Sequence, residues 1–135
     1  MTEHAKDKGI EVCLHNLHLL SEQTVFDTVA KHLLTQGKRA FDTQRGGCRY
    51  LANDGKMCAV GCLIAEDEYQ THMEGADVGE LFQVVGLQRA HYDLLYALQD
   101  VHDCEHPRNW KACLRSLAVR RGLNPGITFE EVYDV

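Results

Sequence analysis

The sequence predicts an α+β fold: a mainly helical single domain with three long helices and a small β-hairpin. Three stretches carry apolar residues at the spacing of one helical face, and a cluster of turn residues separates two short strand-like stretches near the middle of the chain. The chain has 135 residues, of which 44% are apolar, enough to bury one core but not two. We therefore expect a single globular domain over residues 10–135, preceded by a polar, flexible tail over residues 1–9.

The first long helix is expected from Ser21 to Gln36. Its apolar residues repeat with helical spacing, at Val25, Phe26, Val29, Ala30, Leu33 and Leu34. Ser21 or Thr24 can accept a hydrogen bond from the first turn, and Gly37 can adopt the left-handed conformation that often ends a helix. Both ends of this helix are therefore marked in the sequence.

The β-hairpin is expected around Asn53-Asp54-Gly55, because these residues tolerate the positive φ angles of a tight turn. Cys48 to Leu51 would form one arm, and the other arm would start at Lys56. The apolar run from Ala59 to Ile64 is too short for its periodicity to separate the end of a strand from a buried helical turn. Both interpretations stay open.

Two further long helices and one short helix are predicted in the C-terminal half. Asp77 and Glu80 fit a capping pair that opens the short helix. The second long helix is expected from Leu87 to about Asp103, with a stripe of apolar residues on one face. Pro107 suits the first position of the third long helix, which the cations, glycine and proline of RRGLNP would end.

The charge and hydropathy of the chain argue against several broad classes of protein. The formal charge is -6, which leaves no general basic surface for phosphate groups, so nucleic-acid binding is not expected. No apolar run approaches the ~20 residues that span a bilayer, and the first residues lack the apolar core of a signal peptide. We therefore expect no membrane attachment and a cytoplasmic location, where reducing conditions keep the six cysteines as free thiols.

Cys48, Cys58 and Cys62 raise the question of a metal site, because their spacing is C-x9-C-x3-C. A fourth ligand could come from a later histidine or cysteine, namely His72, His102, Cys104 or His106. Common zinc motifs use pairs of C-x2-C elements, which this chain lacks, and small thiols are also frequent in buried cores. The sequence therefore predicts no metal and no cofactor, with a structural zinc as an open alternative.

A thiol nucleophile is the other chemical hypothesis for this segment. Cys62 lies where a strand would pass into a helix, and unpaired backbone amides at such a point stabilise a thiolate. His102 would act as the base and Asp103 would orient it, as in Cys-His-Asp catalysis. Cys58 and Trp110 would contact the ligand. The chain has no P-loop, dinucleotide-binding, zinc-protease or nucleophile-elbow motif, so a binding protein is favoured over an enzyme.

Several strings in the chain resemble a family of small bacteriophage and bacterial proteins with no established activity. These strings are FDTVAKHLLTQGKRA, CRY, NDGKMCAVGCLIAEDEY, HMEG, LQDVHD and NWKACLRSLAVRRGL. Together they cover roughly Thr24 to Leu123, and the most specific part runs from Gly55 to Ile64. The resemblance implies a phage-type context rather than a particular reaction.

The leading hypothesis from the sequence is a small accessory interaction protein of a phage or mobile element. Such a protein would bind a host protein in the host cytoplasm, in anti-defence or in host takeover. The alternative is a small thiol-dependent enzyme or ligand-binding protein, which would use the segment with Cys58 and Cys62 together with His102 and Asp103.

Overall fold

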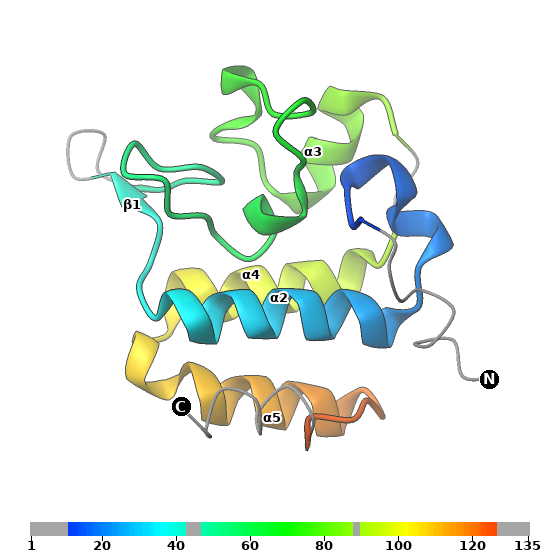
Figure 1. Ribbon diagram of the computed structural model, residues 1–135, viewed down its shortest axis with the longest axis vertical. Coiled ribbons are helices and arrows are strands. Elements are labelled where there is room, and N and C mark those ends of the chain that lie inside the picture. The colour runs from blue at the N-terminus through cyan, green and yellow to red at the C-terminus, as the bar shows by residue number, and fades with distance from the viewer. Residues whose placement is uncertain (1–10, 43–46, 88–89, 127–135) are drawn as a thin grey trace.

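The computed structural model describes residues 11–42, 47–87 and 90–126. Within these ranges three long helices, α2 (Glu22–Gln36), α4 (Tyr92–Cys104) and α5 (Trp110–Arg120), form a bundle in which each helix contacts the other two. The short helix α3 (Val78–Val85) packs on α4. Figure 1 shows α3 and the connecting loops on one side of the bundle and α5 on the other. Short 3₁₀ turns complete the described elements, at Leu14–Leu19, Gly61–Leu63, Thr71–Met73 and Pro107–Asn109.

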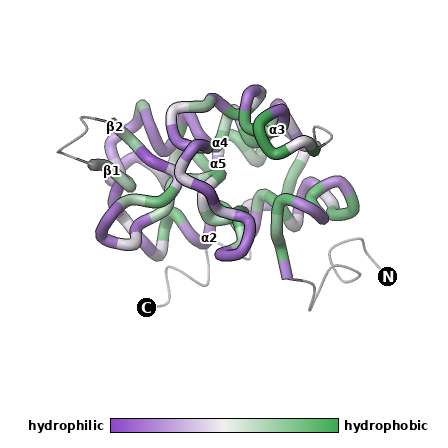
Figure 2. Tube along the Cα trace, turned by 90° about the horizontal axis from the view of Figure 1, so that it is seen from above, coloured by the Kyte–Doolittle hydropathy of each residue, from purple (hydrophilic) through white to green (hydrophobic). Residues whose placement is uncertain are grey.

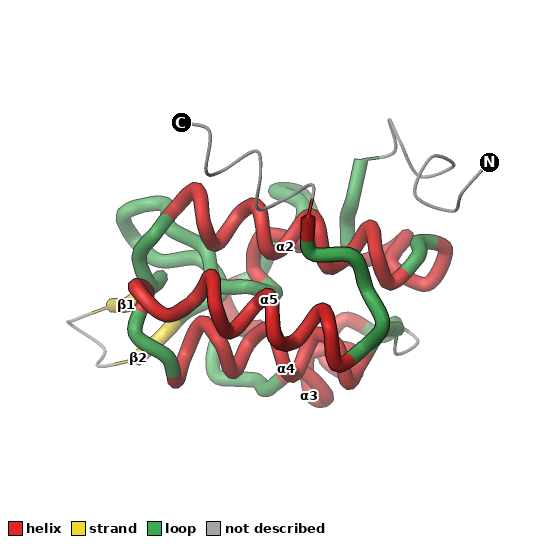
Figure 3. Tube along the Cα trace, turned by 90° about the horizontal axis from the view of Figure 1, so that it is seen from below, coloured by secondary structure: helices red, strands yellow, loops and turns green. Residues whose placement is uncertain are grey.

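The predicted α+β class is wrong, because the described residues form an all-α fold without a β-sheet layer. Strand pairing among them is limited to two-residue strands, β1 (Phe41–Asp42) with β2 (Gly47–Cys48), and to one isolated bridge between Leu51 and Met57. Figure 3 shows how small the two strands are beside the helices.

The turn of the predicted hairpin is present even though its arms form no ladder. Gly55 has a φ of +89°, and the Ala52 N–H donates to the Lys56 carbonyl at 2.8 Å. After this turn the chain enters the 3₁₀ turn Gly61–Leu63. Of the two interpretations of the apolar run from Ala59 to Ile64, the buried helical turn is therefore confirmed.

Pairing between the arms is limited to the bridge between Leu51 and Met57, which two backbone bonds enclose, from the Ala52 N–H to the Lys56 carbonyl and from the Cys58 N–H to the Tyr50 carbonyl. The Glu74 carboxylate accepts the N–H groups of Tyr50 and Leu51 at 2.9 and 3.1 Å. The Gln36 Oε1 accepts the N–H of Met57 at 2.9 Å. At this bridge the N–H groups of Leu51 and Met57 point away from the opposite arm, so Glu74 and Gln36 satisfy amides that the pairing leaves free. The Tyr50 N–H, which would face Cys58 in a longer ladder, donates to Glu74 instead.

The helix ends predicted from capping residues at Ser21, Gly37 and Asp77 are confirmed. The Ser21 hydroxyl accepts the Thr24 N–H at 3.1 Å, and Gly37 ends α2 with a φ of 68°. Asp77 and Glu80 form the predicted capping box, in which each side chain accepts the backbone N–H of the other residue, at 2.8 and 3.2 Å. These bonds satisfy amides that the first turn leaves free.

Two of the long helices begin later in the chain than predicted. Helix α4 starts after the predicted Leu87, because Gly86 closes α3 in the left-handed conformation and the Leu87 N–H donates back to the Phe82 carbonyl at 3.0 Å. Pro107 opens a 3₁₀ turn, and helix α5 follows from Trp110.

The described residues share one apolar core between the helices. Its fully buried side chains include Phe26, Phe82, Leu94, Leu98 and Trp110. Hydrophobic and hydrophilic residues alternate along the long helices in Figure 2, as expected for helices with one buried face. The predicted tail, residues 1–9, lies outside the described residues. Within the described ranges no helix combines the length and the apolar character needed to cross a bilayer.

Gly61 allows two loop segments to cross at close range. A Cβ atom added at this buried position would lie 1.9 Å from the carbonyl oxygen of Tyr50. That oxygen also accepts the Cys58 N–H at 3.3 Å, so the Tyr50 backbone is not free to move away. The glycine in the cysteine-rich segment is therefore required by backbone packing.

We predict that Gly61→Ala lowers the free energy of unfolding by about 3 kcal/mol, because the new methyl group forces the two backbones apart. Gly55→Ala is the matched control, since a Cβ there meets nothing within 4 Å and the cost of its left-handed φ is about 1 kcal/mol. Urea denaturation followed by circular dichroism measures both values. Equal stability of the two variants would contradict the close crossing.

Candidate functional site

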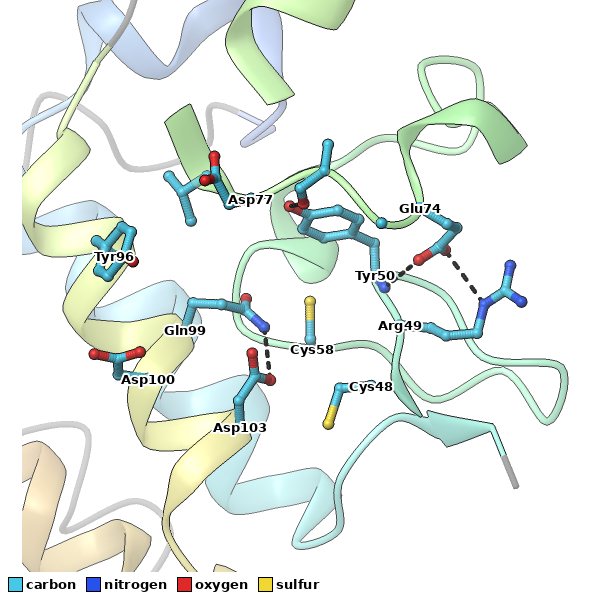
Figure 4. Close-up of a pocket in the computed structure, with 13 residues that line it drawn as sticks. Cys48, Arg49, Tyr50, Cys58, Glu74, Asp77, Tyr96, Gln99, Asp100 and Asp103 are labelled. Carbon is cyan, nitrogen blue, oxygen red and sulfur yellow. Dashed lines mark hydrogen bonds and ion pairs between the residues drawn. The ribbon is translucent and has the colours of Figure 1, made fainter. Parts of the chain in front are cut away.

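A pocket of about 270 Å³ opens between α4 and the loops on its flank. One wall is the face of α4 from Tyr96 to Asp103, and the others are the segments 48–50 and 74–78 together with Cys58. Figure 4 shows the labelled side chains around this opening. The pocket therefore joins segments that lie far apart in the sequence.

The α4 wall consists of Tyr96, Gln99, Asp100 and Asp103. Their spacing of i, i+3, i+4 and i+7 places them on one face of the helix. Gln99 is held at both ends, because its Oε1 accepts the Val60 N–H at 3.1 Å and its Nε2 donates to Asp103 Oδ1 at 2.9 Å. Tyr96 and Asp100 are exposed, so a ligand can reach them.

The Glu74 carboxylate fixes the opposite wall. Besides the N–H groups of Tyr50 and Leu51, it accepts the Tyr69 hydroxyl at 2.6 Å. The Arg49 Nε lies 3.7 Å from the same carboxylate, and Figure 4 shows this guanidinium pointing away from α4. The positive charge of Arg49 is therefore directed toward Glu74 rather than into the pocket.

His102 lies behind the pocket with its side chain fully buried. Its Nε2 accepts the Ala40 N–H at 2.9 Å, and a backbone N–H can only donate. In the neutral ring the proton must then be on Nδ1, which donates to Asp103 Oδ1 at 2.6 Å. The ring also stacks on Trp110, with 5.6 Å between the ring centroids. Both ring nitrogens are thus used in holding the fold.

Asp103 is the acceptor at the centre of this cluster. It accepts hydrogen bonds from the His102 ring and the Gln99 amide, and the Cys48 thiol also donates to it. The sulfur of Cys48 and the ligand atoms of the other two residues of the group, His102 and Asp103, lie within 4.8 Å of one another. Three donors therefore fix the orientation of one carboxylate at the base of the pocket.

The chemistry of this cluster does not suit a metal ion. A metal ion would have to bind a lone pair on one of the His102 ring nitrogens. Nδ1 carries the proton, and the lone pair of Nε2 accepts the Ala40 N–H. Cys48 and Asp103 alone are too few for the tetrahedral site that zinc prefers. Nor do the described residues bring the sulfurs of Cys48, Cys58 and Cys62 together as a ligand group, so the zinc alternative has no support in the geometry.

The three thiols of the predicted metal and nucleophile segment are held in their protonated form. Burial, together with the negative charge of Asp103 and its hydrogen bond, raises the pKa of Cys48 from 9.0 to about 11. Burial raises the pKa of Cys62 to about 12, and it also raises the pKa of Cys58. Because the thiolate is the nucleophile, these positions are unreactive at neutral pH.

The structure brings together two of the three residues predicted for catalysis. His102 and Asp103 contact each other, but Cys62 lies outside their cluster, and its Sγ donates to the Ala59 carbonyl at 3.1 Å. Cys48 occupies the position expected for Cys62. The role of the imidazole also differs, because Nδ1 of His102 donates to Asp103 and Nε2 accepts the Ala40 N–H, so neither nitrogen has a free lone pair to take a thiol proton, as thiol catalysis requires.

Of the two predicted binding residues, Cys58 lines the pocket and Trp110 does not. Trp110 is fully buried against His102, and its Nε1 donates to the Glu105 carbonyl at 3.1 Å. Sequence reasoning missed most of the polar lining, namely Tyr50, Glu74, Asp77, Tyr96, Gln99 and Asp100. The α4 residues carried a usable signal, their helical spacing, whereas the loop residues carried none.

No protein-family model, no curated protein and no solved structure matches this chain.

We predict that Cys48 reacts slowly with iodoacetamide at mildly alkaline pH. A pKa of about 11 gives a thiolate fraction about 100-fold smaller than a thiol with a pKa of 9.0 would have. Exposed Cys104 is the internal control, and peptide mass spectrometry after timed alkylation measures both rates. Asp103→Asn removes the charge beside Cys48, so it should accelerate labelling of Cys48 more than that of Cys104. Equal rates at the two cysteines in the wild type would contradict the assignment.

Proposed function

We propose that this chain is a binding protein without catalytic activity of its own, and that the pocket beside α4 receives a side chain of a partner protein. One observation supports the proposal: the imidazole and carboxylate that could transfer protons are hydrogen-bonded within the fold, while an aromatic ring and a second carboxylate face solvent. His102 and Asp103 bind each other and their surroundings, whereas Tyr96 and Asp100 are exposed at the mouth. The thiol-dependent alternative gains no support from thiols that stay protonated.

The inner residues of the pocket support a preformed binding site. Gln99 connects α4 to the Val60 amide, and the Tyr50 hydroxyl donates to the Ala76 carbonyl. Glu74 binds two backbone amides of the facing loop. A pocket whose walls are already ordered binds its ligand at a smaller entropic cost.

The size of the pocket favours a small group over a cofactor. Its volume of about 270 Å³ is below the ~300–1,000 Å³ typical of pockets for drug-sized ligands. A single side chain of a partner suits this space, and anchor side chains in such pockets commonly dominate the binding energy of protein interfaces.

The proposed partner is a host protein. The resemblance to small bacteriophage proteins supports an accessory role in a phage or mobile element, including anti-defence or host takeover in the host cytoplasm. The formal charge of -6 argues against nucleic acid as the general partner.

The proposal predicts that Tyr96→Ala reduces recovery of the partner from bacterial lysate at least about tenfold, as expected for loss of an interface anchor. The tagged full-length chain is the bait, and Val119→Ala is the matched control. Val119 is also an exposed apolar side chain on a long helix, 66% exposed, but it does not line the pocket.

Wild type and Val119→Ala should recover the same protein in stoichiometric amount, and circular dichroism should show that all three baits are equally folded. Equal recovery by Tyr96→Ala, or no stoichiometric protein with the wild type under several growth and salt conditions, would contradict the proposal.

A further inference from the structure

Resting on the proposed binding role of this pocket, we infer that its occupant is the guanidinium group of an arginine side chain. The charge of the lining is the first observation. Four carboxylates line the pocket, those of Glu74, Asp77, Asp100 and Asp103, and the guanidinium among the lining residues lies against Glu74. The remaining carboxylates give the space beside α4 a negative potential, which a cationic ligand relieves.

The spacing of the carboxylates distinguishes an organic cation from a metal ion. Within the described residues, the cluster of Cys48, His102 and Asp103 is the one set of three metal-type ligand atoms within 4.8 Å of one another. Asp77 and Asp100 therefore belong to no compact chelate, whereas Ca²⁺ and Mg²⁺ need several oxygens at ~2.0–2.6 Å. A planar guanidinium carries five N–H donors and can reach acceptors on separate walls.

Two acceptors at the mouth are available to such a ligand. The Asp100 carboxylate has no hydrogen bond or ion pair with any residue that the structure describes. Asp77 uses Oδ1 for the Glu80 N–H of the capping box, which leaves Oδ2 for a ligand. Figure 4 shows Tyr96 and Asp100 on the α4 wall and Asp77 on the loop segment that leads into α3, with Tyr96 between the two carboxylates. The free carboxylate oxygens therefore flank an aromatic ring.

The aromatic side chains supply the second, independent observation. Tyr96 is 45% exposed at the mouth, and Tyr50 forms part of the inner lining. The face of an aromatic ring attracts a cation, and guanidinium stacks on such a face while losing less hydration than an ammonium group. Carboxylates and tyrosines together favour arginine over lysine.

The inference predicts a ranking of small probes in an NMR titration of the ¹⁵N-labelled full chain. Nα-acetyl-arginine methylamide should shift resonances of residues 96–103 and 74–78 in a saturable way. The lysine analogue should bind more weakly. The citrulline analogue, which has the shape of arginine without its charge, should bind at least about tenfold more weakly than arginine. Added salt should weaken the binding of arginine, because the mouth is open to solvent.

Asp100→Asn should weaken binding of the arginine probe about tenfold, since it removes a charged acceptor. Asp67→Asn is the matched control, because Asp67 is also exposed but does not line the pocket. This variant should bind the arginine probe with the same affinity as the wild type.

The arginine assignment would be wrong if the arginine probe shifted no pocket resonances, or if the citrulline probe bound with equal affinity. It would also be wrong if Asp100→Asn bound the arginine probe as tightly as the wild type, or if Ca²⁺ or Mg²⁺ alone shifted the pocket resonances as strongly as that probe. None of these results would by itself contradict the proposed binding role. That role fails only if the Tyr96-dependent capture of a partner fails.

Discussion

The buried ring of His102 is the interaction on which the pocket depends. It receives the Ala40 amide from the segment after α2, donates to Asp103 on its own helix, and stacks on Trp110 at the start of α5. Buried polar groups are nearly always satisfied, and leaving one without its partner costs about 1–3 kcal/mol. One side chain of α4 therefore connects the start of α5 with the segment after α2 and sets the orientation of the carboxylate below the pocket.

The same arrangement explains why a site with a thiol, an imidazole and a carboxylate need not be catalytic. The Cys48 thiol lies beside both the His102 ring and the Asp103 carboxylate, and burial together with the negative charge of Asp103 raises its pKa. The carboxylate that orders the base of the pocket therefore also helps to keep the Cys48 thiol protonated. The groups that face solvent are those at the mouth, the phenol ring of Tyr96 and the carboxylate of Asp100.

Local signals made the helices predictable, and long-range contacts made the site unpredictable. Ser21, Gly37 and Asp77 each mark a helix end through bonds within a few residues. The predicted hairpin stops after one bridge, where the Tyr50 N–H that would continue the pairing donates to Glu74, 24 residues away, a contact that no turn motif reports. The bond between Ala40 and His102 spans 62 residues, so the sequence could not indicate that Cys48, rather than Cys62, would lie beside that ring. The polar stripe of α4 was visible in the sequence, but nothing there showed which loops would face it.

The geometry places the proton of His102 on Nδ1, where it is donated to Asp103, while Nε2 accepts the Ala40 N–H. Long-range ¹H–¹⁵N NMR of the histidine ring in the full chain reports this tautomer directly. We expect a single tautomer, with Nδ1 protonated and Nε2 acting as the acceptor. A proton on Nε2, or a ring that exchanges between both tautomers, would contradict it, because the Ala40 amide would lose its acceptor and Asp103 would no longer be held by the imidazole.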